Sequence, residues 1–136
     1  MTKTGGCLCG KVRYEIEGEP MFTALCHCTN CQKQGGAAFS VNLLVNEAQL
    51  TVEGDLKTFE DKGDSGNNVY RKFCGNCGSP NVSELEAFPG MVAVKGGTLN
   101  DASRLNPTVQ TYCDSKQDWV SLPESITAFA KSPPAG

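Results

Sequence analysis

The chain has 136 residues and a formal net charge of −3, so its length fits one domain and argues against two. The acidic balance, with no local run of basic residues, argues against a nucleic-acid binder, whose affinity rests mainly on Lys and Arg. The charged opening segment, residues 1–15, and the short apolar runs predict neither a signal peptide nor a membrane span. We therefore expect a cytoplasmic protein without nucleic-acid or membrane partners.

The fold is predicted to be mainly β, because short segments rich in β-branched and aromatic residues recur between Gly, Asn, Asp and Pro. The clearest case is the first segment, where Val12, Tyr14 and Ile16 alternate with charged residues as in a half-buried strand. The predicted strands are 11–17, 39–45, 50–54, 56–60, 69–74, 91–97 and 107–113.

Helical signals in the sequence are weak and brief. We expect one short helix that begins after Thr29 as its N-cap and a second over 100–105. The single domain is placed at 5–130, and the Pro-rich ending 131–136 is expected to be a disordered tail without function.

Seven of the eight cysteines fall into three clusters, which in a reducing compartment indicate metal or redox chemistry rather than disulfides. The first and last clusters are pairs beside glycines, and together their four thiolates could close a tetrahedral zinc site that stabilises the fold. The middle cluster offers three ligands, which leaves one corner for water or a substrate atom, as in catalytic zinc sites. The clusters are Cys7 and Cys9, then Cys26, Cys28 and Cys31, then Cys74 and Cys77.

Other interpretations of the same cysteines stay open, because spacing alone does not fix how the clusters combine. The outer pairs could be redox dithiols, although no thioredoxin-like βαβ pattern accompanies them. The middle cluster could be a second structural site completed by Cys113 or His27. However, His27 stands between two proposed ligands, so in an extended segment its ring points away from their metal. Cys113 is expected to be a small buried hydrophobe.

Five stretches of the sequence resemble the glutathione-dependent formaldehyde-activating enzyme family, whose relatives include centromere protein V. They are GGCLCGKVRYEI, CHCTNCQKQGGAAFS, YRKFCGNCGSP, VAVKGGTLND and DWVSLP, and they span residues 5–123 in family order. The resemblance implies packed antiparallel β-sheets that carry two zinc ions. It matches the structural zinc to Cys7, Cys9, Cys74 and Cys77, and the catalytic zinc to Cys26, Cys28 and Cys31.

The activity associated with this family joins formaldehyde to glutathione, which is formally a carbon–sulfur lyase reaction run in reverse. An open zinc position would bind such a small thiol as the thiolate, lowering its pKa from the free value of about 8.5. Three thiolates leave a zinc site with net negative charge, so cations are expected nearby. The candidates are Lys33, Arg71 and Lys72, and Lys33 and Arg71 are also candidates to bind the substrate's carboxylates. The competing hypothesis is a non-catalytic, zinc-stapled β module that binds a protein partner.

Overall fold

The structure is a computed structural model that describes residues 2–63 and 66–132. It is mainly β, as predicted. The strands are β1 (Thr2–Gly6), β2 (Arg13–Glu17), β3 (Phe22–Cys26), β4 (Ser40–Asn46), β5 (Leu50–Glu53), β6 (Leu56–Lys62), β7 (Asn68–Cys74), β8 (Pro80–Leu85), β9 (Met91–Lys95), β10 (Val109–Thr111) and β11 (Thr127–Ala128). The helices are α1 (Thr29–Gly35) and three 3-10 turns, η1 (Glu47–Gln49), η2 (Gly96–Thr98) and η3 (Cys113–Ser115).

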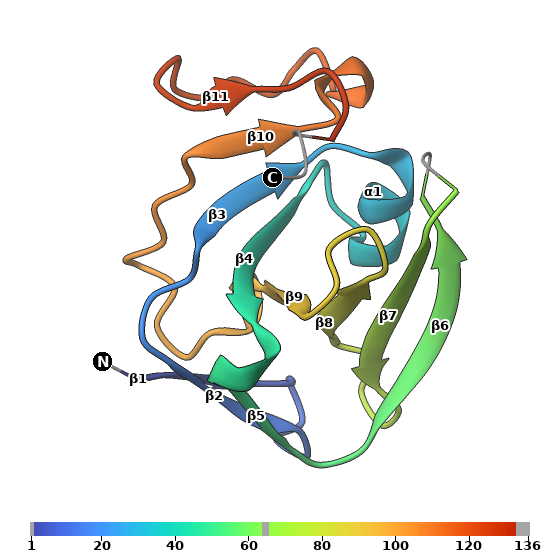
Figure 1. Ribbon diagram of the computed structural model, residues 1–136, viewed down its shortest axis with the longest axis vertical. Helices are drawn as coiled ribbons and strands as arrows, with labels where there is room; N and C mark the ends of the chain where they lie inside the picture. Colours follow the sequence, from blue (N-terminus) through green and yellow to red (C-terminus); the bar gives the residue numbers. More distant parts are fainter. Residues whose placement is uncertain (1, 64–65, 133–136) are drawn as a thin grey trace.

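The strands form two sheets that pack against each other (Figure 1). The small sheet has the order β1-β2-β5, and the large sheet has the order β11-β10-β3-β4-β9-β8-β7-β6. Neighbours are antiparallel, as the family resemblance implies, except that β10 runs parallel to both β3 and β11. The first and last strands lie in different sheets, with β1 in the small one and β11 in the large one.

The hydrophobic core fills the space between the two sheets. From the small sheet, Tyr14 and Ile16 are almost fully buried, while their charged neighbours on β2 are exposed. The alternation predicted for 11–17 is thereby confirmed, because one face of β2 meets the core and the other meets water. From the large sheet, the core receives Leu43, Val45, Val82, Val92 and Val94.

The other face of the large sheet is polar where it meets α1. Directly opposed residues of antiparallel strands place their side chains on the same face, so the strand register identifies the members of this face. Most of its polar residues are buried or half-buried, so this surface is a polar interior rather than a solvated one. Its opposed pairs include Cys26 with Ser40, Asn42 with Lys95, and Arg71 with Ser83.

The predicted strands are found, but with some different ends, and four were missed. The strand expected at 91–97 ends at Lys95 because η2 follows, and the one expected at 107–113 is reduced to β10. The missed strands are β1, β3, β8 and β11.

The helix predicted over 100–105 is wrong. Asn100 is tied to β1 instead, because its main-chain and side-chain nitrogens both donate to Thr4. Asp101 then accepts hydrogen bonds from the amide and hydroxyl of Ser103. Such local side-chain bonds favour a turn over a helix.

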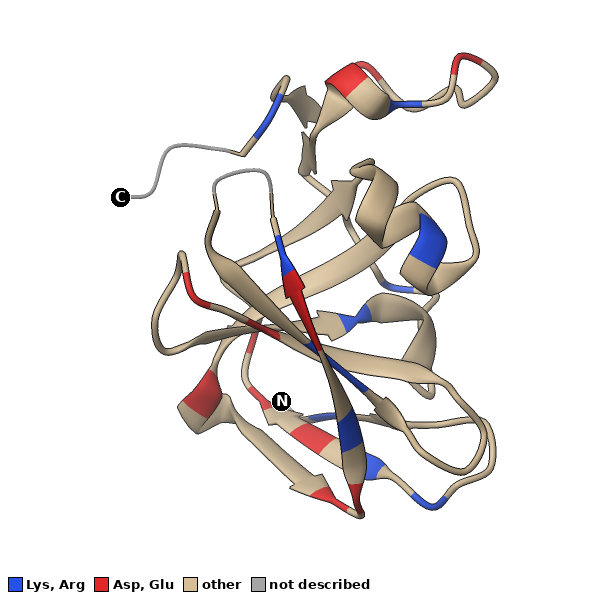
Figure 2. Ribbon diagram, turned by 90° about the vertical axis from the view of Figure 1, so that its right-hand side faces the viewer, with Lys and Arg blue, Asp and Glu red and all other residues tan. Residues whose placement is uncertain are grey.

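Acidic and basic residues are interspersed on the side of the molecule drawn in Figure 2. No helix in the two described ranges has the length and apolar character needed to cross a membrane. The single-domain limits 5–130 stay a prediction. The expected tail, 131–136, lies outside the described residues from 133 onward.

Candidate metal centres

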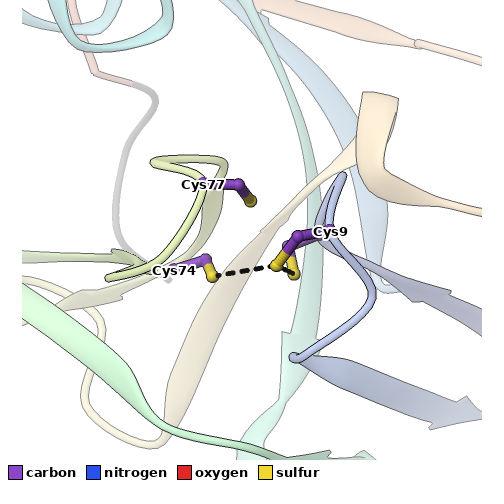
Figure 3. Close-up of side chains that lie close together, drawn as sticks. Cys9, Cys74 and Cys77 are labelled. Carbon is purple, nitrogen blue, oxygen red and sulfur yellow. Dashed lines mark hydrogen bonds between the residues drawn. The ribbon is translucent and has the colours of Figure 1, made fainter.

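Four cysteines from two distant turns meet where the small sheet joins the large one. Cys7 and Cys9 follow β1, whereas Cys74 ends β7 and Cys77 lies in the turn to β8. The Sγ atom of Cys9 is 3.5 Å from that of Cys7 and 3.7 Å from that of Cys74, and Figure 3 shows Cys9, Cys74 and Cys77 pointing toward one another. All four Sγ atoms lie within 4.8 Å of one another. One tetrahedral ion with bonds of about 2.3 Å to sulfur could bind all four.

Backbone amides point at the sulfur atoms of this four-cysteine cluster, as expected for thiolate ligands. The Val12 amide donates to Cys7 Sγ at 3.2 Å and the Asn76 amide donates to Cys74 Sγ at 3.4 Å. A hydrogen bond from the Ser79 hydroxyl, followed by backbone donors, lowers the pKa of Cys77 to about 5. Gly78 has a φ of 81° that closes the turn, a conformation that glycine adopts without strain.

The other three clustered cysteines meet where β3 leads into α1. Cys26 ends β3, Cys28 is the N-cap of α1, and Cys31 lies in the first turn of the helix. Their Sγ atoms also lie within 4.8 Å of one another. The cap is Cys28 rather than the expected Thr29, and its Sγ accepts a hydrogen bond from the Cys31 amide at 3.2 Å. The bond that starts the helix therefore also sets the spacing of two candidate ligands.

The three thiols of this cluster have very different pKa values. Hydrogen bonds from Cys26 and Cys28, together with the positive charges of Lys95 and Arg71, lower the pKa of Cys31 far below that of an ordinary thiol. Hydrogen bonding to Cys28 and Cys31, followed by burial, raises the pKa of Cys26. Because metals bind thiolates and not thiols, an ion here would replace the shared protons. The soft, all-sulfur donor set suits zinc.

Among the described residues, neither His27 nor Cys113 joins the three-cysteine cluster. The His27 ring is fully buried, with Nε2 at 3.0 Å from Gln110 Oε1 and its edge against Phe39. Cys113 is half-buried, and its Sγ donates to the Gln110 carbonyl at 3.8 Å. The His27 ring thus ties the segment that follows β3 to β10, in agreement with the expectation that it points away from the ligands.

Two cationic side chains lie beside the three-cysteine cluster. Both terminal nitrogens of Arg71 face the Cys31 sulfur, at 3.7 and 3.8 Å, while its Nε donates to Asp61 at 2.9 Å. The Lys95 ammonium donates to Asn42 Oδ1 at 3.0 Å, and its charge interacts with all three thiols. Burial lowers the pKa of Lys95, and the nearby thiolates oppose that shift. These cations offset the negative charge of a three-thiolate site.

The family model described as glutathione-dependent formaldehyde-activating enzyme matches residues 2–115, which contain both cysteine clusters. The chain belongs to this family. A crystal structure of a Rhodobacter sphaeroides protein has a similar fold, with a TM-score of 0.58 and 22% sequence identity over 76% of this chain and 91% of that chain. No curated protein matches the chain.

In this member of the formaldehyde-activating family, the structure places one of the three expected cations, Arg71, at the three-cysteine cluster. Lys33 is exposed in the last turn of α1. Lys72 pairs with Glu84 at 3.0 Å on the face of the large sheet that also carries Val82. Sequence reasoning misses Lys95, because it is far from every cysteine cluster along the chain. The one sequence signal that could have found it is its position as a charged residue at the end of the apolar strand β9.

The buried ion pair beside this site gives a testable prediction for stability. The side chains of Arg71 and Asp61 are 5% and 18% exposed, and Asp61 also accepts hydrogen bonds from Asn30 on α1. Arg71→Met leaves the carboxylate buried without its cation, so we expect the free energy of unfolding to fall by about 3 kcal/mol, measured by urea denaturation.

The matched control for this variant is Lys72→Met on the same strand. Its ion pair is much more exposed, at 30% and 42%, so its loss should cost less than about 1 kcal/mol. Equal losses in the two variants would contradict a buried ion pair. Adding Asp61→Asn to Arg71→Met should recover part of the stability, because it removes the unpaired charge.

Proposed function

We propose that this chain is a zinc-dependent carbon–sulfur lyase that joins a small thiol such as glutathione to formaldehyde and cleaves the adduct in the reverse direction. The observation that supports it most is the difference between the two clusters. One has four sulfur atoms, whereas the other has three and no further sulfur or imidazole among the described residues. The description of the family names the same thiol and the same aldehyde.

We propose zinc for both clusters. Cys7, Cys9, Cys74 and Cys77 would enclose a structural ion, since four protein ligands leave no position for a substrate. Cys26, Cys28 and Cys31 would hold the catalytic ion. When bound there, zinc would supply the positive charge that lowers the pKa of a substrate thiol and favours its thiolate form.

The residues around the three-cysteine cluster have separate proposed roles. Arg71 donates to Cys31 from a position that is 4% exposed, so it reduces the negative charge that repels an incoming thiolate. Lys33 is exposed on the same helix as Cys31, and we propose that it attracts a carboxylate of the thiol substrate. All eight cysteines are free, which supports a reducing location such as the cytoplasm.

Metal analysis and adduct turnover together test this function. We expect about two zinc ions per purified chain, one of them removed more readily by a chelator. Exchange between glutathione, formaldehyde and their adduct, followed by NMR, should exceed the spontaneous rate. A protein that binds both ions but accelerates adduct formation with neither glutathione nor other small thiols would contradict the enzyme. It would favour the zinc-stapled module that binds a protein partner.

A further inference from the structure

Lys95 lies on the same face of the large sheet as the three-cysteine cluster. The register opposes Cys26 on β3 to Ser40 on β4, and Asn42 on β4 to Lys95 on β9. Ser40 and Asn42 are two residues apart on one strand, so their side chains and those of their partners share one face. The charge of Lys95 interacts with each of the three thiols. The ammonium therefore stands beside the cluster rather than at the edge of the sheet.

The Lys95 ammonium has fewer partners in the structure than the Arg71 guanidinium, each of whose three nitrogens already faces an acceptor. An ammonium has three N–H donors, and Asn42 is the one hydrogen-bond partner of the Lys95 ammonium among the described residues. Arg71 directs its Nε to Asp61 and both terminal nitrogens to Cys31. Of the two cations beside the cluster, Lys95 is thus the less committed one, with two of its three N–H donors left for a further acceptor.

A buried hydroxyl on the neighbouring strand also lacks a partner. Ser83 on β8 is 3% exposed, and its Oγ makes no hydrogen bond to any described residue. Ser83 is opposed to Arg71 on one side and to Ala93 on the other, and Ala93 is two residues before Lys95. Its hydroxyl therefore faces the same side as both cations. A buried polar group without a hydrogen-bond partner costs stability. A ligand that forms a hydrogen bond with the Ser83 hydroxyl would remove that cost.

We propose that Lys95, positioned by Asn42 and assisted by Ser83, binds the carbonyl oxygen of the aldehyde as the carbon–sulfur bond forms. This inference rests on the proposed function. In the step, the thiolate sulfur attacks the carbonyl carbon, the C–S bond forms, and the C=O π electrons move onto oxygen. The oxygen then takes one proton from water, which replaces the proton that the thiol released on ionising. Donors fixed in advance around a developing oxyanion lower the barrier in this way.

The carbonyl oxygen fits Lys95 better than a carboxylate of the thiol does. In the adduct, the oxygen is separated from the substrate sulfur by a single carbon atom. The carboxylates of glutathione are many bonds further from its sulfur. A cation whose charge reaches all three thiols is therefore close to the reacting atoms, while the exposed Lys33 is better placed for the distant carboxylates.

The test compares Lys95→Met with Lys72→Met, which removes a lysine from the opposite face of the sheet. We expect kcat for adduct formation to fall about 100- to 1000-fold in Lys95→Met, the loss typical of one oxyanion donor, and to stay unchanged in Lys72→Met. Calorimetric binding of glutathione without aldehyde should stay unchanged in both, as should the zinc content. Lys95→Arg should recover part of kcat, because it restores the charge.

Several outcomes would overturn the role of Lys95. One is a Lys95→Met protein with normal kcat, and another is a loss of thiol affinity as large as the loss in kcat, which would assign Lys95 to the thiol. If Lys95→Met does not fold, Ser83→Ala takes its place: a loss of kcat of about 10-fold with unchanged thiol binding supports the proposal, and unchanged kcat refutes it. Wild-type protein without any turnover would overturn the proposed function and this role together.

Discussion

Replacing Cys77 by serine is expected to unfold most of the domain. The four-cysteine cluster joins the turn after β1 to the turn after β7, and a serine hydroxyl is a poor substitute for a thiolate zinc ligand. Structural zinc contributes about 10–16 kcal/mol to folding in small zinc domains, whereas whole domains are stable by only about 5–15 kcal/mol. Far-UV circular dichroism with a thermal scan should therefore show loss of the cooperative unfolding transition, or a transition at much lower temperature.

The control for this variant is Cys113→Ser. Cys113 lies outside both clusters, and its sulfur makes only a long hydrogen bond to the Gln110 carbonyl among described residues, so its replacement should leave the metal content and the melting temperature close to those of the wild type. A Cys77→Ser protein that melts like the control would show that this cluster does not stabilise the fold.

The cysteine clusters could be predicted because the ligand spacing within each cluster is local. A few residues around a turn or a helix cap set the distances within a cluster, as the bond from the Cys31 amide to Cys28 shows. The combination of Cys7 and Cys9 with Cys74 and Cys77 depends on how two sheets pack. Spacing left it open, and the family resemblance supplied it. The structure brings the same four together.

The missed strands lack the alternation that marks a half-buried strand. Residues 23–26 of β3 form an unbroken buried run, because β3 lies between β10 and β4 inside the large sheet. In β1, Gly5 has no side chain that could reveal a pattern, yet glycine is needed there. A Cβ atom would lie 2.4 Å from the Tyr14 hydroxyl. The same Cβ atom would lie 2.5 Å from the Thr98 carbonyl oxygen, and the approach of a residue so far along the chain is not visible in local sequence patterns.

Local sequence also fails to predict which cations lie beside the three-cysteine cluster. Lys33 and Lys72 are near cysteines in the sequence. However, side chains are distributed around a helix and alternate across a strand, so a sequence neighbour of a ligand can point away from the metal site. Lys33 is exposed and Lys72 pairs with Glu84. Arg71 reaches Cys31 because its side chain lies on the face of the large sheet that meets α1, and Lys95 reaches the cluster through the pairing of β4 with β9.

Replacing Cys28 by serine should have the opposite outcome to Cys77→Ser, with loss of activity and retention of the fold. Cys28 is both a candidate zinc ligand and the N-cap of α1. Serine is among the best N-cap residues, so its hydroxyl can take over the bond from the Cys31 amide while the sulfur ligand is lost. We expect the melting temperature to stay near that of the wild type, and adduct turnover to fall by more than about 100-fold, since even changes to groups that only support zinc ligands cost 10- to 100-fold.

Cys28→Ala separates the two roles of this residue. It removes the ligand and the cap together, so it should match Cys28→Ser in zinc content and activity but be less stable by about 1 kcal/mol in urea denaturation. If Cys28→Ser instead unfolds to the same extent as Cys77→Ser, the three-cysteine cluster is a second structural site. That result would contradict the proposed enzyme, which requires that the loss of this ligand removes activity while the fold is retained. A folded Cys28→Ser protein that binds one zinc ion fewer therefore tests whether the third ligand serves chemistry rather than folding.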